Sequence, residues 1–135
     1  MTVADRDAVL AANQAFYAAF RAGDVKAMDA VWAEAAPVTC IHPGWDVLIG
    51  RDQVMASWVA IISNSGRPRI RADDANIVVI GDMALVTCHE RISGALLIAT
   101  NVFVKESGAW RLIHHQASQA PEPEPSPSSA GETVH

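Results

Sequence analysis

Two adjacent histidines, His114 and His115, and one acid, Glu90, are the side chains of this sequence best suited to chemistry. An imidazole titrates near neutral pH, so it can exchange a proton during a reaction, and it is also a common metal ligand. If Glu90 and His115 share an apolar cavity, burial raises the carboxyl pKa and a nearby imidazolium lowers it again. Such a pair could act as general acid and base. The alternative is that Glu90 and Asn101 form a hydrogen-bonded pair that orients one ordered water.

The histidine pair lies in TNVFVKESGAWRLIHHQAS, which is typical of two strands joined by a turn. Neighbouring strand side chains point to opposite faces, so His114 and His115 cannot both enter one cavity or chelate one metal. A two-residue Ser-Gly loop places His114 on the face of Asn101, whereas a three-residue loop that begins at Glu106 places His115 there. The longer loop asks only glycine to adopt positive φ, which serine disfavours. We therefore predict that His115 faces inward with Asn101.

Other polar and aromatic side chains could form the cavity around this pair. Tyr17 could lean into the cavity or stand on a helix flank with its hydroxyl in water. Trp58 is expected in the core and as a cavity wall, and Trp110 on the outer side of the sheet. His42 and Asp46 could form a couple, but turn chemistry explains the stretch HPGWD without it. The predicted ligand-binding residues are Tyr17, Trp58, Glu90, Asn101, Phe103 and His115, and the catalytic candidates are His115 and Glu90.

Several classes of site lack their usual sequence pattern. No His-x-His, His-x-x-x-His or Cys-x-x-Cys spacing occurs, so no metal site is expected. We find no glycine-rich phosphate loop and no Ser or Cys nucleophile motif, and we expect no cofactor. The formal net charge of -5 and the lack of a basic run disfavour binding to nucleic acid.

The 135 residues, half of them hydrophobic, are typical of one globular domain with its own core. The first residues, MTVADRDAVL, carry acids where a signal peptide carries basic residues. No apolar run approaches the ~20 residues of a membrane span. Without an export signal, Cys40 and Cys88 are interpreted as reduced thiols in a cytoplasmic protein that does not bind membranes.

Three helices are predicted from apolar residues at helical spacing. The first covers residues 3–21, and Gly23 is placed to end it. Asp24 is placed to cap a second helix, whose apolar stripe runs over residues 25–32. A third helix begins at Arg51 and ends in the stretch SNSGRP.

Strands are predicted both between and after these helices. Residues 38–42 alternate in polarity, Pro43-Gly44 is a turn signal, and residues 45–49 form a short return strand. After the third helix, regular Gly-containing turns indicate an antiparallel meander. Its four strands are predicted at residues 70–81, 83–93, 95–106 and 109–118.

The face that Glu90 occupies depends on the turn after its strand. A one-residue slip at the Ser93-Gly94 turn would turn His89 inward and Glu90 outward. The predicted domain covers residues 1–119. Residues 120–135 are rich in Pro, Ser and Glu, and we expect them to form a disordered tail because they cannot bury enough apolar surface.

In the strand predicted over residues 95–104, the side chains that point to either face are largely apolar. A sheet with two apolar faces needs cover on both, and three helices can cover only one. We therefore expect a homodimer in which the outer face packs against a second copy of the sheet. The alternative is that strand propensity alone placed Val and Ile on an exposed face.

Three stretches, FYAAFRAGDVKAMDAVWAE, VTCIHPGWDVLIGRDQVMASW and TNVFVKESGAWRLIHHQAS, together resemble the nuclear transport factor 2-like superfamily in its SnoaL-like branch. The association domain of calcium/calmodulin-dependent protein kinase is similar at the same places. The resemblance covers residues 3–118. It implies an α+β roll of the cystatin-like type, in which a strongly curved, cone-shaped antiparallel or mixed sheet wraps around a pocket and three helices cover it. It also implies association through the outer face of the sheet.

The resemblance does not carry over any one activity. In the kinase association domain, the positions that match Glu90, Asn101 and Ala117 carry arginines that line its pocket, and here those charges are absent. Steroid-isomerase members use a helix tyrosine where this chain has Phe16, with Tyr17 adjacent. They also use an aspartate on the first strand, where this chain has TCIHP. Members of the superfamily include isomerases, cyclases, dehydratases and modules that only bind or assemble.

Three functions follow as hypotheses. The first is a homodimeric protein that binds a small apolar or weakly polar molecule in a mostly apolar pocket. The second is an isomerase, cyclase or dehydratase in which His115 or Glu90 moves protons. The third is an assembly module without chemistry.

Overall fold

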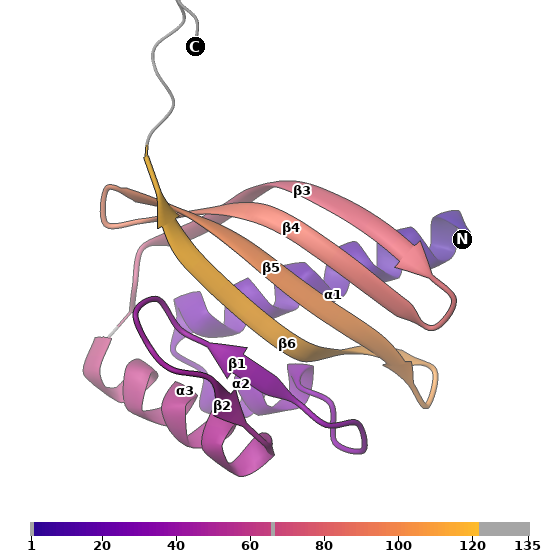
Figure 1. The fold of residues 1–135 in the computed structure, drawn as a ribbon, viewed down its shortest axis with the longest axis horizontal. Coiled ribbons are helices and arrows are strands. Elements are labelled where there is room, and N and C mark those ends of the chain that lie inside the picture. The colour runs from indigo at the N-terminus through magenta and orange to yellow at the C-terminus, as the bar shows by residue number, and fades with distance from the viewer. Residues whose placement is uncertain (1, 66, 122–135) are drawn as a thin grey trace, which may run out of the picture.

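The structure is a computed structural model that describes residues 2–65 and 67–121. Within this part of the chain, three helices accompany a six-stranded sheet with the order β2-β1-β6-β5-β4-β3 (Figure 1). Strands β1 and β6 are parallel, and the other neighbouring pairs are antiparallel. The predicted α+β class and the four-strand meander are confirmed, and the sheet is open at its β2 and β3 edges. The elements are α1 (Val3–Ala22), α2 (Val25–Val31), β1 (Thr39–Ile41), β2 (Leu48–Ile49), α3 (Arg51–Ser65), β3 (Ile70–Ile80), β4 (Met83–Ile92), β5 (Ala95–Glu106) and β6 (Ala109–Ala120).

The first two helices begin and end where local chemistry predicts. The Thr2 side chain caps α1 by accepting a hydrogen bond from the backbone N–H of Asp5. Gly23, with φ of 66°, ends α1 in the left-handed conformation that glycine adopts without strain. The Asp24 carboxylate then accepts from the backbone N–H of Ala27 and caps α2. The predicted end of α1 at Gly23 and the predicted cap of α2 at Asp24 are confirmed.

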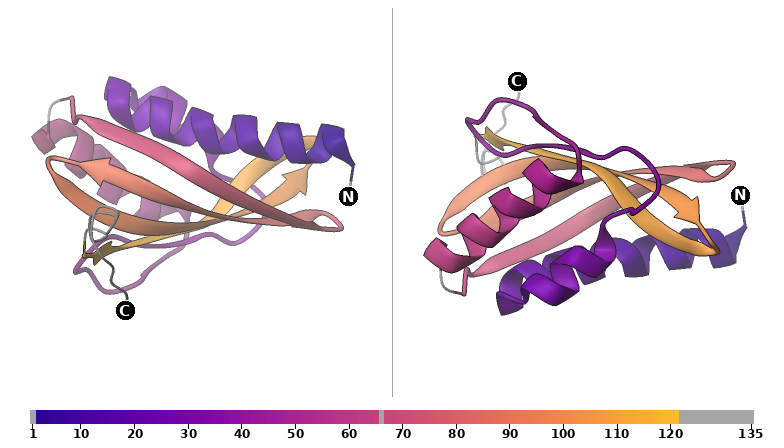
Figure 2. Two further views of the ribbon diagram at one scale, coloured as in Figure 1. Left: turned by 90° about the horizontal axis from the view of Figure 1, so that it is seen from above. Right: turned by 90° about the horizontal axis from the view of Figure 1, so that it is seen from below.

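The helices cover one face of a strongly twisted sheet, and α1 runs across it (Figure 2). We call this helix-covered side the inner face and the opposite side the outer face. The side chains of β5 alternate between the inner and the outer face, as predicted for a strand. Inner-face residues of β5 are Leu97, Ala99, Asn101 and Phe103, and outer-face residues are Ile98, Thr100, Val102 and Val104.

The loop between β5 and β6 corrects the sequence prediction. Glu106 pairs with Ala109, so the loop has two residues, not three. Both Ser107 (φ 52°) and Gly108 (φ 81°) have positive φ, which is a type I′ turn. A type I′ turn matches the right-handed twist of the two strands, and this favourable match outweighs the conformational strain of a serine at positive φ.

A β-bulge on β6 nevertheless turns His115 inward. Phe103 pairs with Leu112 but Val102 pairs with His114, so Ile113 is an extra residue on β6. The bulge reverses the alternation of faces along β6. His115 is therefore on the inner face opposite Asn101, as predicted, although the predicted loop was wrong.

Trp110 lies before the bulge, and its predicted position on the outer side of the sheet is wrong. It pairs with Lys105 and is buried on the inner face, with the Lys105 ammonium 5.8 Å from the centre of its ring. The hairpin around residues 38–49 is also shorter than predicted. The Pro43-Gly44 turn is present, with the backbone N–H of Trp45 donating to the His42 carbonyl, but Leu48–Ile49 is all that remains of the return strand.

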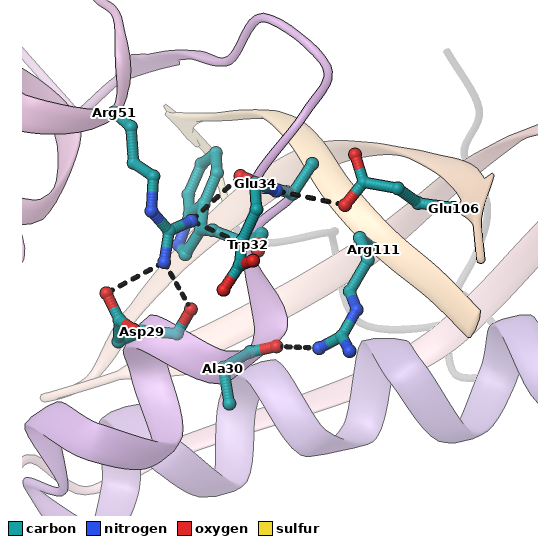
Figure 3. Close-up of polar contacts among 8 residues, drawn as sticks. Asp29, Ala30, Trp32, Glu34, Arg51, Glu106 and Arg111 are labelled. Atoms are coloured by element: carbon teal, nitrogen blue, oxygen red, sulfur yellow. Dashed lines mark hydrogen bonds and ion pairs between the residues drawn. The ribbon is translucent and has the colours of Figure 1, made fainter.

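Polar contacts hold the start of α3 and the end of the β5–β6 hairpin against α2 and the segment that follows it (Figure 3). The Arg51 guanidinium donates to the carbonyl oxygens of Trp32 and Ala33 and to the Asp29 carboxylate, the last at 2.8 Å. The Glu106 carboxylate accepts from the backbone N–H groups of residues 34–36, and the Arg111 guanidinium donates to the Ala30 carbonyl. The Arg51 contacts thus tie α3, and the Glu106 and Arg111 contacts tie the hairpin, to α2 and the segment after it.

Three other predictions concern the ends and the cysteines. Strand β6 continues through Ala120, which the sequence analysis placed in the tail. The predicted disorder of the tail concerns residues that lie almost wholly outside the described ranges. Cys40 and Cys88 are free and buried. No helix of the described residues combines the length and the hydropathy that a membrane span requires.

Candidate functional site

A hydrogen-bonded polar network lies on the inner face around Asn101. The Asn101 amide nitrogen donates to Asn13 Oδ1 at 2.8 Å and to the Tyr17 hydroxyl at 3.2 Å. Its amide oxygen lies 2.6 Å from Nδ1 of His115. Because an amide oxygen only accepts, Nδ1 of His115 carries the proton. A neutral His115 therefore has its lone pair on Nε2.

Glu90 joins this network from β4. The Tyr17 hydroxyl donates to Glu90 Oε2 at 2.6 Å, and the same oxygen lies 3.9 Å from Nε2 of His115. The predicted orientation of Glu90 is confirmed, since Glu90 is buried while His89 contacts Asp74 on the outer face. Helix α1 and strands β4, β5 and β6 thus each contribute a polar side chain to one cluster.

Burial controls the charge of this cluster. It raises the pKa of Glu90, and the hydrogen bond from Tyr17 offsets part of the rise. It lowers the pKa of His115 to about 3, with smaller contributions from His42 and His114. It also raises the pKa of Tyr17 far above the usual phenol value. His115 is therefore a neutral base at pH 7, beside a carboxyl group that holds its proton more tightly than usual.

An apolar cavity of about 250 Å³ opens beside Glu90 and His115. Both side chains line it, together with Ala117 on β6. The Trp58 ring lies edge-on to Phe16 and Phe20 at centroid distances of 5.4 and 5.2 Å. The aromatic walls of the cavity are Phe16, Phe20, His42, Trp45 and Trp58.

His42 belongs to this cavity, and the sequence analysis missed it. It is 4% exposed, its Nε2 lies 2.9 Å from Ser57 Oγ, and its ring stands edge-on to Trp58 at 4.7 Å. Burial lowers its pKa to about 4. The predicted alternation over residues 38–42 contained the signal, because it put His42 on the same face as the buried Cys40. Turn chemistry explained His42 without a site, and its partner on α3 is invisible in the local sequence.

Only some of the predicted ligand-binding residues line the apolar cavity. Trp58, Glu90 and His115 line the apolar cavity. Tyr17 is 2% exposed, so the alternative with its hydroxyl in water is wrong. Asn101 lies behind His115 and holds its ring. Phe103 is fully buried in the core and lines neither this cavity nor the one beside α1 described next.

A second cavity of about 370 Å³ lies between α1 and β3. Tyr17 and Cys88 stand at its inner wall. Its polar lining residues include Asn13, Gln14, Arg21, Asp73 and Asp74.

Asp73, Asp74 and His89 place one possible metal-ligand atom each within 4.8 Å of one another. The members of this group come from two strands, so no spacing in the sequence reveals it. The guanidinium of Arg71 lies 3.2 Å from the Asp73 carboxylate, so this carboxylate already has a cationic partner. No residue of the group lines the apolar cavity.

Comparison with known proteins places this geometry in context. A family model described as a SnoaL-like domain matches residues 9–122. A protein of the NTF2-like family from Streptomyces avermitilis, provisionally named a dehydratase, is 34% identical, with a TM-score of 0.82 over 87% of this chain and 97% of that one. A protein from Thiobacillus denitrificans, provisionally named a calcium/calmodulin-dependent protein kinase type II association domain, is 33% identical, with a TM-score of 0.76 over 82% of this chain and 94% of that one.

More distant matches share the fold or part of the sequence. An NTF2-like protein of unknown function from Pseudomonas putida has a TM-score of 0.79 at 18% identity, over 87% of this chain and 88% of that one. The F-box protein SKIP8 of Arabidopsis thaliana is 26% identical over 113 residues, which are 82% of this chain. This chain spans about half of that protein's length, 49%.

Proposed function

This chain belongs to the SnoaL-like domain family, and on that premise we propose that it binds a small, mostly apolar molecule in the aromatic cavity. The observation that carries the proposal is an open volume of about 250 Å³ with aromatic walls and few polar groups, among them Glu90 and His115. Ligand sites are commonly built in this way, with apolar walls and few polar groups that fix orientation. In an assembly module without a ligand, side chains would be expected to fill this volume.

The volume also bounds the ligand. It lies below the range of about 300–1,000 Å³ that is common for drug-sized molecules, so we expect a ligand of one or two rings. The polar network behind the cavity favours a preformed site, because Asn101 holds the His115 ring and Tyr17 holds the Glu90 carboxyl group. A preformed site loses little conformational entropy on binding.

Native mass spectrometry of freshly purified protein tests this proposal, because it reports any retained small molecule together with the oligomer. We expect a retained mass that disappears in Ala117→Phe, whose added ring fills the cavity from β6. The matched control is Ala60→Phe, on the exposed side of α3, which keeps the retained mass. Equal retention by both variants would place the ligand elsewhere and contradict the proposal.

Acid–base catalysis is a second candidate function, as in an isomerase, cyclase or dehydratase. It is favoured by the 3.9 Å distance between Glu90 Oε2 and His115 Nε2, and by the 34% identity to the protein provisionally named a dehydratase. With a substrate found among retained ligands, Glu90→Gln and His115→Gln should each lower kcat by roughly 10²- to 10⁴-fold. Unchanged rates in both variants would leave binding as the function.

We also propose that two copies associate through the outer face. Register places Val78, Leu85 and Val102 in one row across β3, β4 and β5. Val78 is 44% exposed and Leu85 is 40% exposed, so this row presents apolar surface to solvent that a second copy could cover. In sedimentation velocity over a concentration series, Leu85→Asp should give monomer where the unaltered protein gives dimer, and Ala60→Asp on α3 should not. A monomeric unaltered protein at high concentration would contradict the proposal.

We propose the cytoplasm as the location of the protein. Its two cysteines, Cys40 and Cys88, are buried and free, as expected in a reducing compartment. Fractionation of the source cells, followed by titration of thiols in the denatured protein, should find the chain in the cytoplasm with both thiols reduced.

A further inference from the structure

The hydrogen bonds of Ser57 fix the position of the proton on His42. Ser57 Oγ lies 2.6 Å from the backbone carbonyl oxygen of Val54 on α3. A carbonyl oxygen can only accept, so the single hydroxyl proton of Ser57 points at Val54. The same Oγ lies 2.9 Å from Nε2 of His42 and must accept there. Nε2 of His42 therefore carries a proton.

A neutral imidazole has one ring proton, so Nδ1 of His42 is an acceptor. Burial keeps the ring neutral at pH 7 by lowering its pKa to about 4. Nδ1 has no hydrogen-bond partner among the described residues, and the ring lines the apolar cavity between Trp45 and Trp58. The free lone pair of His42 is therefore on Nδ1, in a ring that lines the cavity.

The remaining polar groups of the cavity do not suit an anion. His115 is also neutral and has its lone pair on Nε2, and its ring centre lies 6.5 Å from that of His42. Glu90 adds carboxyl oxygens. No lysine or arginine of the described chain lines this cavity. An anionic ligand would lose its hydration without gaining a countercharge, whereas a neutral molecule with a hydroxyl group has a donor for these acceptors.

Building on the binding function proposed above, we propose that the cavity selects neutral aromatic alcohols of one or two rings, whose hydroxyl group donates to Nδ1 of His42. His42 is then the residue that determines specificity, and Ser57 is a positioning residue that acts through it. The rings of Phe16, Trp45 and Trp58 supply the surfaces against which the aromatic part of the ligand packs.

The test compares two probes with the same ring system, 2-naphthol and its methyl ether, 2-methoxynaphthalene, in which a methyl group replaces the hydroxyl proton; the His42→Phe variant separates the loss of the donor from the added volume. Isothermal titration calorimetry on the full chain should show a preference of roughly 3- to 10-fold for naphthol, as expected for one net hydrogen bond. His42→Phe keeps an aromatic ring but has no acceptor, so it should bind both probes equally. Ser57→Ala should reduce the preference, because the proton on Nε2 then loses its acceptor.

A second measurement reports the tautomer without any ligand. Long-range ¹H–¹⁵N correlation spectra of the ¹⁵N-labelled protein should show His42 protonated on Nε2 alone at pH 7, and the Ser57→Ala spectrum should lose this pure pattern. The matched control for both measurements is His89→Phe, since His89 lies on the outer face beside Asp74. It should keep the probe preference and the His42 signals.

The outcomes separate the two proposals. Equal binding of both probes to the unaltered protein, or a His42 signal protonated on Nδ1, would overturn the role of His42 and leave the binding function standing. A preference for 2-naphthol that survives in His42→Phe but disappears in Glu90→Gln would also overturn the role of His42. Binding of neither probe, with a retained ligand in the mass spectrum, would overturn the alcohol class. Binding of neither probe and no retained ligand would overturn the binding function itself.

Discussion

Asn101 and Thr100 are neighbours on β5, yet they belong to two very different surfaces. Asn101 is fully buried on the inner face, and both ends of its amide group have hydrogen-bond partners from α1 and β6. Thr100 lies on the outer face in a sheet surface where Val78 and Leu85 stay 44% and 40% exposed. Directional contacts fix the inner face, whereas the outer face offers apolar area without fixed partners.

This difference indicates what each face can do. Buried polar groups that all find partners hold one geometry, which is what a binding or catalytic site needs. An apolar sheet surface is not directional, and it gains free energy by losing contact with water, which suits association with another copy. The same strands can therefore carry a site on one side and an interface on the other.

The largest difference between the two faces should appear when Asn101 and Thr100 are each replaced by an apolar residue. Asn101→Leu keeps the volume but leaves His115 Nδ1–H and Asn13 Oδ1 without partners, so we expect a loss of roughly 2–5 kcal/mol in the free energy of unfolding. Thr100→Val on the outer face should change it by less than about 0.5 kcal/mol. Urea denaturation of both variants measures the difference. Similar losses in the two would mean that the inner network has no special role in stability.

Acid sensitivity should also distinguish the faces, with a smaller effect. His42 and His115 have pKa values of about 4 and about 3 in the folded protein, below the usual value near 6.5. Between pH 6.5 and pH 5 the unfolded chain therefore binds protons that the folded chain does not, and stability falls. Glu90 opposes this change, because its raised pKa lets the folded chain keep a proton that the unfolded chain releases above about 4.5.

Because one carboxyl group opposes two histidines, we expect a net loss smaller than the roughly 3 kcal/mol that the two histidines alone would give over this range. The groups packed around them are Ser57 on α3, Tyr17 on α1 and Cys40 on β1. Glu90→Gln removes the opposing group, so the loss on acidification should become steeper. Urea midpoints from pH 7 to pH 5 measure this loss. A flat profile in the unaltered protein would contradict the burial of neutral histidines.

Prediction of His115 from the sequence was right about its face and wrong about the reason. A two-residue loop would put His114 inward if β6 were regular, and the bulge at Ile113 reverses that outcome. The two deviations cancel for His115. They do not cancel for Trp110, which precedes the bulge, and its predicted face was therefore wrong. A bulge has weak local signals, because it depends on the neighbours that a strand meets along its length.

Helix caps were easier to predict than the site. Gly23 and Asp24 act through their own backbone and side chain within a few residues, so their roles are visible locally. The role of His42 depends on Ser57, fifteen positions away on α3, and no local pattern reveals that pairing. Family membership could be predicted because it rests on the order of many such local features.

The smallest effect should come from the turn that sets the register of both faces. Ser107, with φ of 52°, occupies a left-handed position of the type I′ turn, and asparagine adopts that conformation more readily than serine. Ser107→Asn should therefore raise the free energy of unfolding by about 0.5 kcal/mol. Ser93→Asn is the matched variant, since Ser93 has φ of 51° in the equivalent turn between β4 and β5. In a three-residue loop Ser107 would have negative φ, and its replacement by asparagine would not raise the stability. A gain in stability at Ser93 alone would therefore indicate the longer loop, in which His115 faces inward without a bulge at Ile113.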